Sequence, residues 1–194
     1  MMRILIVFFS LVGLLFVGIS SSANATEALD QAIQLFNAKQ YTESRLLFEQ
    51  VLADHPNSAT AHYFLGQIYL HTGDFDKAVA HCKISVDLHA EVAAYHFCLG
   101  RSYGEKARQA PLWLQAFLAP KIRQAFENSV ALDPSHRSAR VGLTHFYMQA
   151  PLIMGGSLTK AQEQAETLIQ LKDPRGEQLL QDILKRQNKA RLAN

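Results

Sequence analysis

Histidine and cysteine are the residue types in this chain that could bind a metal, and the chain holds eight histidines and two cysteines. His62 and His96 are 34 residues apart, and His81 and His89 lie between them. Zinc sites built on a helix usually need ligands four residues apart, and none of the eight histidines has that spacing to another. We therefore interpret them as half-buried packing residues, and we keep a metal-binding protein as an alternative.

The sequence offers no other catalytic arrangement. It contains no G-x-S-x-G, no P-loop, no G-x-G-x-x-G and no H-E-x-x-H pattern. The acidic residues are scattered, as solvated carboxylates usually are. We expect a protein that is not an enzyme, with no catalytic residue, no metal site and no cofactor.

His62 and His96 belong to a longer pattern that occurs twice. The motif L-G-x-x-Y stands at residues 65–69 and again at residues 99–103, with a period of 34. In a helix, positions i, i+1 and i+4 share a face, and a glycine there lets a second helix approach closely. A turn at residues 72–75 ends the first helix, and residues 76–88 form the second. Its small residues Ala78 and Cys82 can meet the glycine face.

This pattern resembles the tetratricopeptide repeat family, whose period is 34 residues. The resemblance covers about residues 28–173. It implies an all-α fold, a right-handed solenoid of stacked antiparallel helix pairs. We place the repeats at about 26–58, 59–92, 93–136 and 137–174, followed by a terminal helix over 175–194.

The third repeat carries an insertion. Phe126 follows Cys82 by 44 residues instead of 34, so ten extra residues lie around positions 109–120. They include the only tryptophan, Trp113, and several other apolar residues. We expect a lengthened first helix and then a short helix or turn that packs Trp113 against the solenoid. Pro120 would then occupy the first turn of the next helix, where its missing N–H is not needed.

The first 25 residues have the pattern of a secretory signal peptide. Arg3 precedes an apolar run at residues 4–19, and an A-x-A site follows at Ala23–Ala25. We expect cleavage after Ala25 and a periplasmic or secreted helical domain over residues 26–194. An uncleaved membrane anchor is the alternative, but the run is shorter than the roughly 20 residues that a spanning helix needs. No stable membrane anchor is expected after cleavage.

The formal net charge of the chain is +2 at pH 7. This balance argues against nucleic acid as a partner, because nucleic-acid-binding proteins usually have a clustered basic face. It also argues against a strongly anionic surface as the main partner.

Cys82 and Cys98 fall on neighbouring helices of the implied solenoid. In an exported protein such a pair can be oxidised. Each cysteine alone also fits a small buried apolar residue. A disulfide between Cys82 and Cys98 and two separate buried thiols both remain open, because the sequence gives neither the Cα separation nor the Cβ direction.

The resemblance implies that ligands lie on the concave side, which the first helix of each pair lines. By the register of the family, the inward positions form a groove of mixed aromatic and polar residues: Tyr63, Gln67, Phe97, Arg101, His145 and Met148. Such a set could hold an extended peptide or a helix of a partner protein. We expect a peptide- or protein-binding adaptor or scaffold in the periplasm. The alternative is a structural module that assembles with copies of itself into a homo-oligomer.

Overall fold

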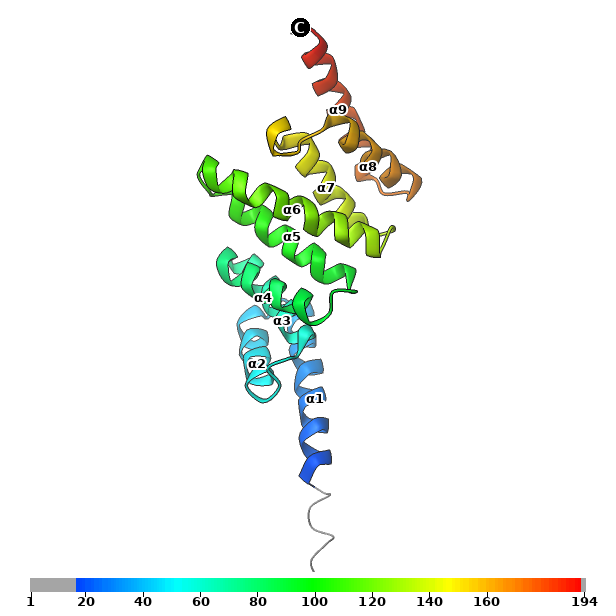
Figure 1. The fold of residues 1–194 in the computed structure, drawn as a ribbon. Coiled ribbons are helices and arrows are strands. Elements are labelled where there is room, and N and C mark those ends of the chain that lie inside the picture. The colour runs from blue at the N-terminus through cyan, green and yellow to red at the C-terminus, as the bar shows by residue number, and fades with distance from the viewer. Residues whose placement is uncertain (1–16, 193–194) are drawn as a thin grey trace, which may run out of the picture.

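A computed structural model describes residues 17–192, and these form an all-helical stack without strands. The helices pair in chain order, each pair lying on the previous one, from α1 at one end to α9 at the other (Figure 1). The fold expected from the repeat is confirmed as an all-α solenoid. The elements are α1 Val17–Asn37, α2 Tyr41–Asp54, α3 Ala59–Thr72, α4 Phe75–Leu88, α5 Ala93–Arg108, α6 Leu112–Leu132, α7 Arg137–Gln149, the short 3₁₀ helix η1 Leu152–Met154, α8 Leu158–Gln170 and α9 Arg175–Leu192.

Local capping sets several of the helix boundaries. The side chains of Ser58, Asp74 and Ser157 each accept a hydrogen bond from a backbone N–H in the first turn of the following helix. Such caps satisfy donors that have no partner within the helix. Gly73 ends α3 with a φ of 81°, a left-handed conformation that glycine adopts without strain. The predicted break at residues 72–75 is therefore a glycine C-cap followed directly by an aspartate N-cap.

The glycines of the repeated motif face the second helix of their own pair, as predicted. A Cβ atom on Gly66 would lie 2.4 Å from the sulfur of Cys82 in α4. A Cβ atom on Gly100 would lie 2.8 Å from the ring of Phe126 in α6. A Cβ atom on Gly142 in α7, the first helix of the next pair, would lie 2.7 Å from the same ring. At these positions a neighbouring side chain packs directly against the helix backbone, which sets the spacing of the stack.

The core lies in two clusters along the stack. One joins α1 to α5 around Phe48, Leu65 and Ile68. The other joins α6 to α9 around Phe126, Leu168 and Ile183. Side chains of α5 reach both clusters, so this helix connects the two halves of the molecule.

The structure corrects the prediction for the insertion. The first helix of the pair, α5, is slightly lengthened as expected, with 16 residues against 14 in α3, but most of the extra residues lengthen the second helix, α6, which has 21. Trp113 lies in the first turn of α6 and its side chain is 72% exposed, so it does not pack against the solenoid. Pro120 lies inside α6. The helix tolerates this proline because the carbonyl that loses its donor belongs to Ala116, on the exposed face.

Two further predictions concern the start of the chain. Residues 1–16, which hold most of the predicted signal peptide, lie outside the described residues. The backbone of α1 runs through the predicted cleavage site at Ala25. Within residues 17–192, none of the helices has the length and apolar character that crossing a bilayer requires.

Candidate binding groove

A groove of about 560 Å³ opens on the second half of the stack, between α5, α6, α7 and η1. Its floor is apolar and comes mainly from α6 and α7, through Ala119, Ile122, Phe126 and Phe146. Its polar groups stand on the walls and rim: Arg101, Glu105, Arg108, Gln115, His145 and Gln149. An apolar floor with few polar groups above it is the usual composition of a binding site.

Two arginines, Arg101 and Arg108, line this groove. Arg101 has no carboxylate partner among the described residues. Its guanidinium carbon lies 5.7 Å from the centre of the Phe97 ring, a cation–π contact that leaves its N–H donors free. Arg108, in contrast, is paired with Glu105 at 2.8 Å. Arg101 could therefore donate two parallel hydrogen bonds to a carboxylate in the groove.

His145 stands one repeat after Arg101 and lines the same groove. Desolvation by the surrounding protein lowers the pKa of its imidazole. Near neutral pH the ring is therefore uncharged and can both donate and accept a hydrogen bond. The two residues together offer a fixed cation and a neutral polar group above an apolar floor.

The loop between α7 and α8 closes one end of the groove and is held rigidly. The backbone N–H of Gly156 donates to the Pro151 carbonyl at 3.0 Å, and that of Ser157 donates to the Tyr147 carbonyl at 2.8 Å. A Cβ atom on Gly156 would lie 1.7 Å from the carbonyl oxygen of Ala150, so only glycine fits there. The loop places Met154 and Pro151 at the groove wall.

Two of the six predicted groove residues, Arg101 and His145, line this groove, and Phe97 contacts Arg101 without lining it. Tyr63 is half-buried and packs against Tyr95, with ring centres 5.1 Å apart, and burial raises the pKa of its hydroxyl. Phe97 packs against Phe126 and His136. These two aromatic side chains mainly hold neighbouring helix pairs together.

Gln67 and Met148 also lie outside the lining of this groove. Gln67 is half-buried on α3, in the first half of the stack. The side chain of Met148 is partly buried against the second core cluster, and its carbonyl accepts a hydrogen bond from Arg186 at 3.1 Å. Sequence reasoning missed the contribution of α6 to the groove, because the register of the first helices carries no information about the floor.

The repeated histidines have a structural role. Nε2 of His62 lies 3.1 Å from the carbonyl of Pro56, and Nε2 of His96 lies 2.8 Å from that of Ala90. At the equivalent position of the next repeat, Nε of Arg140 donates to the carbonyl of Pro134 at 2.8 Å. In each case the acceptor lies six residues earlier, in the turn that connects two pairs. These side chains thus satisfy a turn carbonyl that no helix N–H reaches.

His81 contacts His62 through the two Nδ1 atoms, which are 3.0 Å apart. Because Nε2 of His62 must donate to a carbonyl, its Nδ1 accepts and that of His81 donates while both rings are neutral. Burial and the charge of a protonated His62 lower the pKa of His81 to about 4. Across residues 17–192 no group of three or more His, Cys, Asp or Glu side chains is placed to hold a metal ion.

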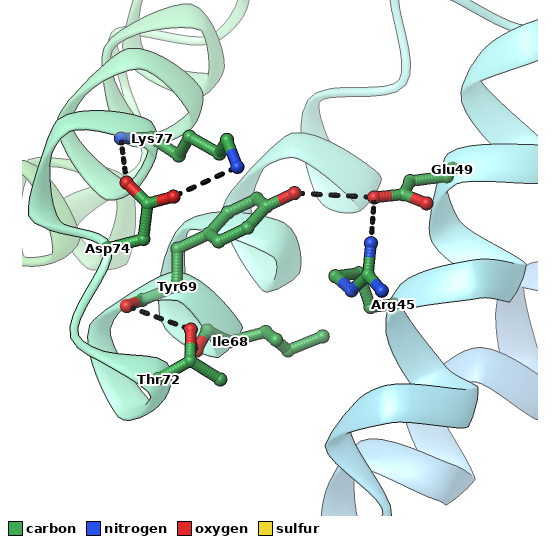
Figure 2. A network of polar contacts seen from close by, with 7 residues as sticks. All are labelled: Arg45, Glu49, Ile68, Tyr69, Thr72, Asp74 and Lys77. Carbon is green, nitrogen blue, oxygen red and sulfur yellow. Dashed lines mark hydrogen bonds and ion pairs between the residues drawn. The ribbon is translucent and has the colours of Figure 1, made fainter.

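Tyr69 of the repeated motif and Tyr147 at the equivalent position of the fourth repeat each connect their helix pair to the one before. The hydroxyl of Tyr69 donates to Glu49 on α2 at 3.3 Å, and Glu49 also pairs with Arg45 at 2.8 Å (Figure 2). The hydroxyl of Tyr147 donates to Glu127 on α6 at 2.6 Å. Both glutamates precede their tyrosine by 20 residues, a spacing that could have been found in the sequence.

A lysine from the second helix of the same pair covers the ring of each motif tyrosine. Lys77 lies over Tyr69, and its ammonium pairs with Asp74 at 2.9 Å (Figure 2). Lys121 and Lys160 lie over Tyr103 and Tyr147 in the same way. Three repeats therefore build the same lysine–tyrosine contact, which fixes the outer face of the stack.

The structure joins Cys82 and Cys98 in a disulfide, with sulfur atoms 2.06 Å apart and Cα atoms 5.7 Å apart. The two residues are 0% and 2% exposed. They join α4 to α5, and therefore one helix pair to the next, directly against Gly66. This arrangement links helices in the first core cluster, away from the groove.

Comparison with known proteins agrees with this architecture. A family model described as tetratricopeptide repeat matches residues 29–93. A search of curated proteins finds no match to the chain. The structural likenesses include TTC0263, a thermophilic TPR protein of Thermus thermophilus. It has a TM-score of 0.67 and 20% identity, over 82% of this chain and 80% of that one.

Two further solved structures are similar over most of this chain. Residues 41 to the end of MamA from Desulfovibrio magneticus RS-1 align with a TM-score of 0.59 and 19% identity, over 79% of this chain and 77% of that one. Human IFIT1, solved as a dimer with PPP-AAAA, aligns with a TM-score of 0.64 and 22% identity over 84% of this chain, which matches 36% of IFIT1. Likenesses at these identities concern the fold alone.

Proposed function

We propose that this chain, which matches a tetratricopeptide repeat model over residues 29–93 and has the fold of solved TPR proteins, is a non-catalytic scaffold that binds a segment of a partner protein in the groove between α5, α6, α7 and η1. Repeat proteins of this kind generally act as protein-interaction modules, because stacked repeats create extended concave surfaces. The observation that supports this site most is the unpaired guanidinium of Arg101 above the apolar floor. A peptide with an acidic group beside a large apolar side chain matches these features.

Photo-crosslinking in the producing cells tests the groove directly. A photoreactive amino acid replaces Gln149, which is exposed on the groove rim. The matched control places it at Gln181, which is exposed on α9 outside the groove. We expect a discrete crosslinked partner from position 149 and none from position 181.

Substitution of the two groove side chains completes this test. The Arg101→Ala/His145→Ala variant removes two polar groups of the groove, and the Arg191→Ala/His55→Ala variant makes the same chemical change at exposed positions elsewhere. Crosslinking from position 149 should fall by about tenfold in the first variant, as loss of a charge-assisted contact predicts. Equal crosslinking in both variants would rule out this groove as the site.

We further propose that the protein acts in the periplasm or outside the cell. The apolar run with its A-x-A site supports export, and the pairing of Cys82 with Cys98 fits an oxidising compartment. The mass of the protein isolated from its native cells tests this: we expect a chain that begins at Thr26. A chain that retains residues 1–25, in the cytoplasmic fraction, would contradict the proposal.

A further inference from the structure

Five large apolar side chains protrude from one region of the surface. Leu112, Trp113 and Phe117 in the first two turns of α6 are 67%, 72% and 59% exposed. Leu152 and Ile153 of η1 are 83% and 93% exposed. Soluble proteins rarely gather large apolar residues in this way without an interaction that covers them. We call these five residues the apolar edge.

Both parts of the apolar edge lie on the same side of the stack. The α5–α6 turn and η1 both lie on the left of the stack in Figure 1. Helix α6 and η1 contact each other, and residues of both line the groove. The five side chains are exposed, and none of them lines the groove.

Charges next to the apolar edge are basic. Between Lys106 and Phe126 the charged residues are Lys106, Arg108, Lys121 and Arg123, with no acid. Between His145 and Gln162 the only charged residue is Lys160. Three of these cations pair with acids, Lys106 with Asp76, Arg108 with Glu105 and Arg123 with Glu127. The positive charges in these two segments without a carboxylate partner among the described residues are Lys121 and Lys160.

The acidic residues of the adjacent turns form ion pairs with basic side chains. Asp74 pairs with Lys77, Asp76 with Lys106 and Glu105 with Arg108. Lys121 has no carboxylate partner among the described residues, and its ammonium lies 4.1 Å from the centre of the Phe117 ring. An aromatic ring with a lysine above it has the apolar body and cationic end that suit a lipid–water interface.

We propose that the apolar edge inserts into the interfacial region of an anionic lipid bilayer, with Lys121 and its basic neighbours against the headgroups. The side chains protrude from two separate turns. A partner protein would need a matching cavity for each turn, whereas a lipid bilayer needs none. Insertion of Trp, Phe, Leu and Ile beside basic residues combines burial of apolar area with attraction to anionic lipids. Docking of this kind is peripheral, and it would hold the scaffold at a membrane with the groove mouth next to the lipid.

Trp113 is the only tryptophan of the chain, so its fluorescence reports on this edge alone. The experiment adds the full chain to vesicles of phosphatidylcholine, with or without an equal part of phosphatidylglycerol, and repeats the titration with brominated acyl chains. We expect a blue shift and bromine quenching of Trp113 that are about tenfold stronger with the anionic vesicles. This readout follows Trp113 itself, because the apolar run at residues 4–19 could bind a vesicle without bringing the edge to the bilayer.

Two variants that keep Trp113 sharpen the test. Phe117→Glu/Ile153→Glu places two carboxylates in the apolar edge, and Leu46→Glu/Leu132→Glu does so at exposed apolar positions elsewhere. The first should lose the blue shift while the second keeps it, with equal helicity by circular dichroism. Fluorescence that is the same in anionic vesicles as in buffer would overturn the proposal.

Other occupants of the edge give distinct results. A blue shift that grows with protein concentration before lipid is added would assign the edge to a second copy of the chain. A shift with a protein extract of the producing cell, but none with vesicles of its lipids, would assign it to a partner protein. Either result would overturn the lipid assignment.

Discussion

At the scale of single residues, Gly66 tests how closely the helices must approach. A Cβ atom there would lie 2.4 Å from the sulfur of Cys82 and 3.2 Å from that of Cys98. Both sulfur atoms are buried and cannot move aside freely, so Gly66→Ala should lower the free energy of unfolding by about 1–3 kcal/mol, the usual cost of overpacking. Thermal or urea unfolding followed by circular dichroism measures the change.

Gly104 provides the matched control on the next first helix. It lies inside α5, and a Cβ atom there would meet nothing within 4 Å. Gly104→Ala should therefore stabilise the protein by about 0.5–1 kcal/mol, because alanine is the better helix former. If both substitutions shift the midpoint in the same direction, packing at the motif glycine does not set the helix spacing.

His81 predicts a dependence of stability on pH. It faces His62, Tyr69, Glu49 and Lys77, and burial lowers its pKa to about 4 from an ordinary value of 6.5. Between these two values the unfolded chain binds a proton that the folded chain does not. The free energy of unfolding should therefore fall, by roughly 1–3 kcal/mol, as the pH is lowered from about 6.5 to 4, and this dependence should level off below pH 4.

Urea unfolding at intervals across this pH range, on the native protein and on His81→Gln, isolates the contribution of this side chain. Glutamine keeps a donor near Nδ1 of His62 but does not titrate, so the slope should be shallower in the variant. His55→Gln at an exposed position serves as the control and should keep the full slope. A variant with the slope of the native protein would show that the His62–His81 contact is not the pH-sensitive element.

At the scale of elements, α9 closes the open end of the second core cluster. Leu179 and Ile183 are 6% and 0% exposed, and the backbone of Gly176 packs against Ile169 of α8. Ending the chain after Pro174 should cost at least about 3 kcal/mol of unfolding free energy, because two buried aliphatic side chains are lost and α8 is uncovered. Differential scanning calorimetry and light scattering would detect a lower melting temperature with aggregation.

A shorter truncation distinguishes the effect of uncovering the second core cluster from the effect of shortening the chain. Ending the chain after Leu184 keeps both buried residues and removes a segment whose contacts include hydrogen bonds from Arg186 and Gln187 and an exposed ion pair of Lys185 with Asp182. This variant should melt within a few degrees of the full chain. If both truncations melt alike, α9 is not the cap of the stack.

The sequence predicts the repeated part of this fold because the period reflects a physical constraint. The glycines at positions 66 and 100 and the capping side chains of Ser58 and Asp74 meet local requirements, so their spacing is visible in the chain. The repeat spacing does not predict the insertion, because ten extra residues can lengthen either helix of a pair equally well. Apolar composition then suggested burial for Trp113, yet the first turn of α6 extends beyond its neighbours and finds no surface to pack on.

The groove was only partly predictable for a related reason. Repeat register identifies which positions of the first helices face inward, and it brought Arg101 and His145 to one surface. Whether an inward side chain lines a space or fills it depends on the neighbouring pair. Phe97 fills its space because Phe126 and His136 stand next to it, and the η1 loop that closes the groove has no equivalent in the repeat.

At the scale of the whole molecule, the bond between Cys82 and Cys98 joins two helix pairs whose packing otherwise depends on side-chain contacts alone. The residues are 16 apart in sequence, and constraining a loop of that length in the unfolded chain is worth about 3 kcal/mol. The Cys82→Ala/Cys98→Ala variant should lose about 2–4 kcal/mol of unfolding free energy and unfold less cooperatively. Because α5 connects both core clusters, weakening its attachment to α4 lets the two halves of the stack open separately. Urea unfolding monitored by Trp113 fluorescence and by circular dichroism would then give two midpoints in the variant and one in the native protein.

Thiol labelling provides the control, since these are the only cysteines: the native protein should label only after both denaturant and reductant are added. Labelling with denaturant alone would show free thiols and remove the basis for the cross-link.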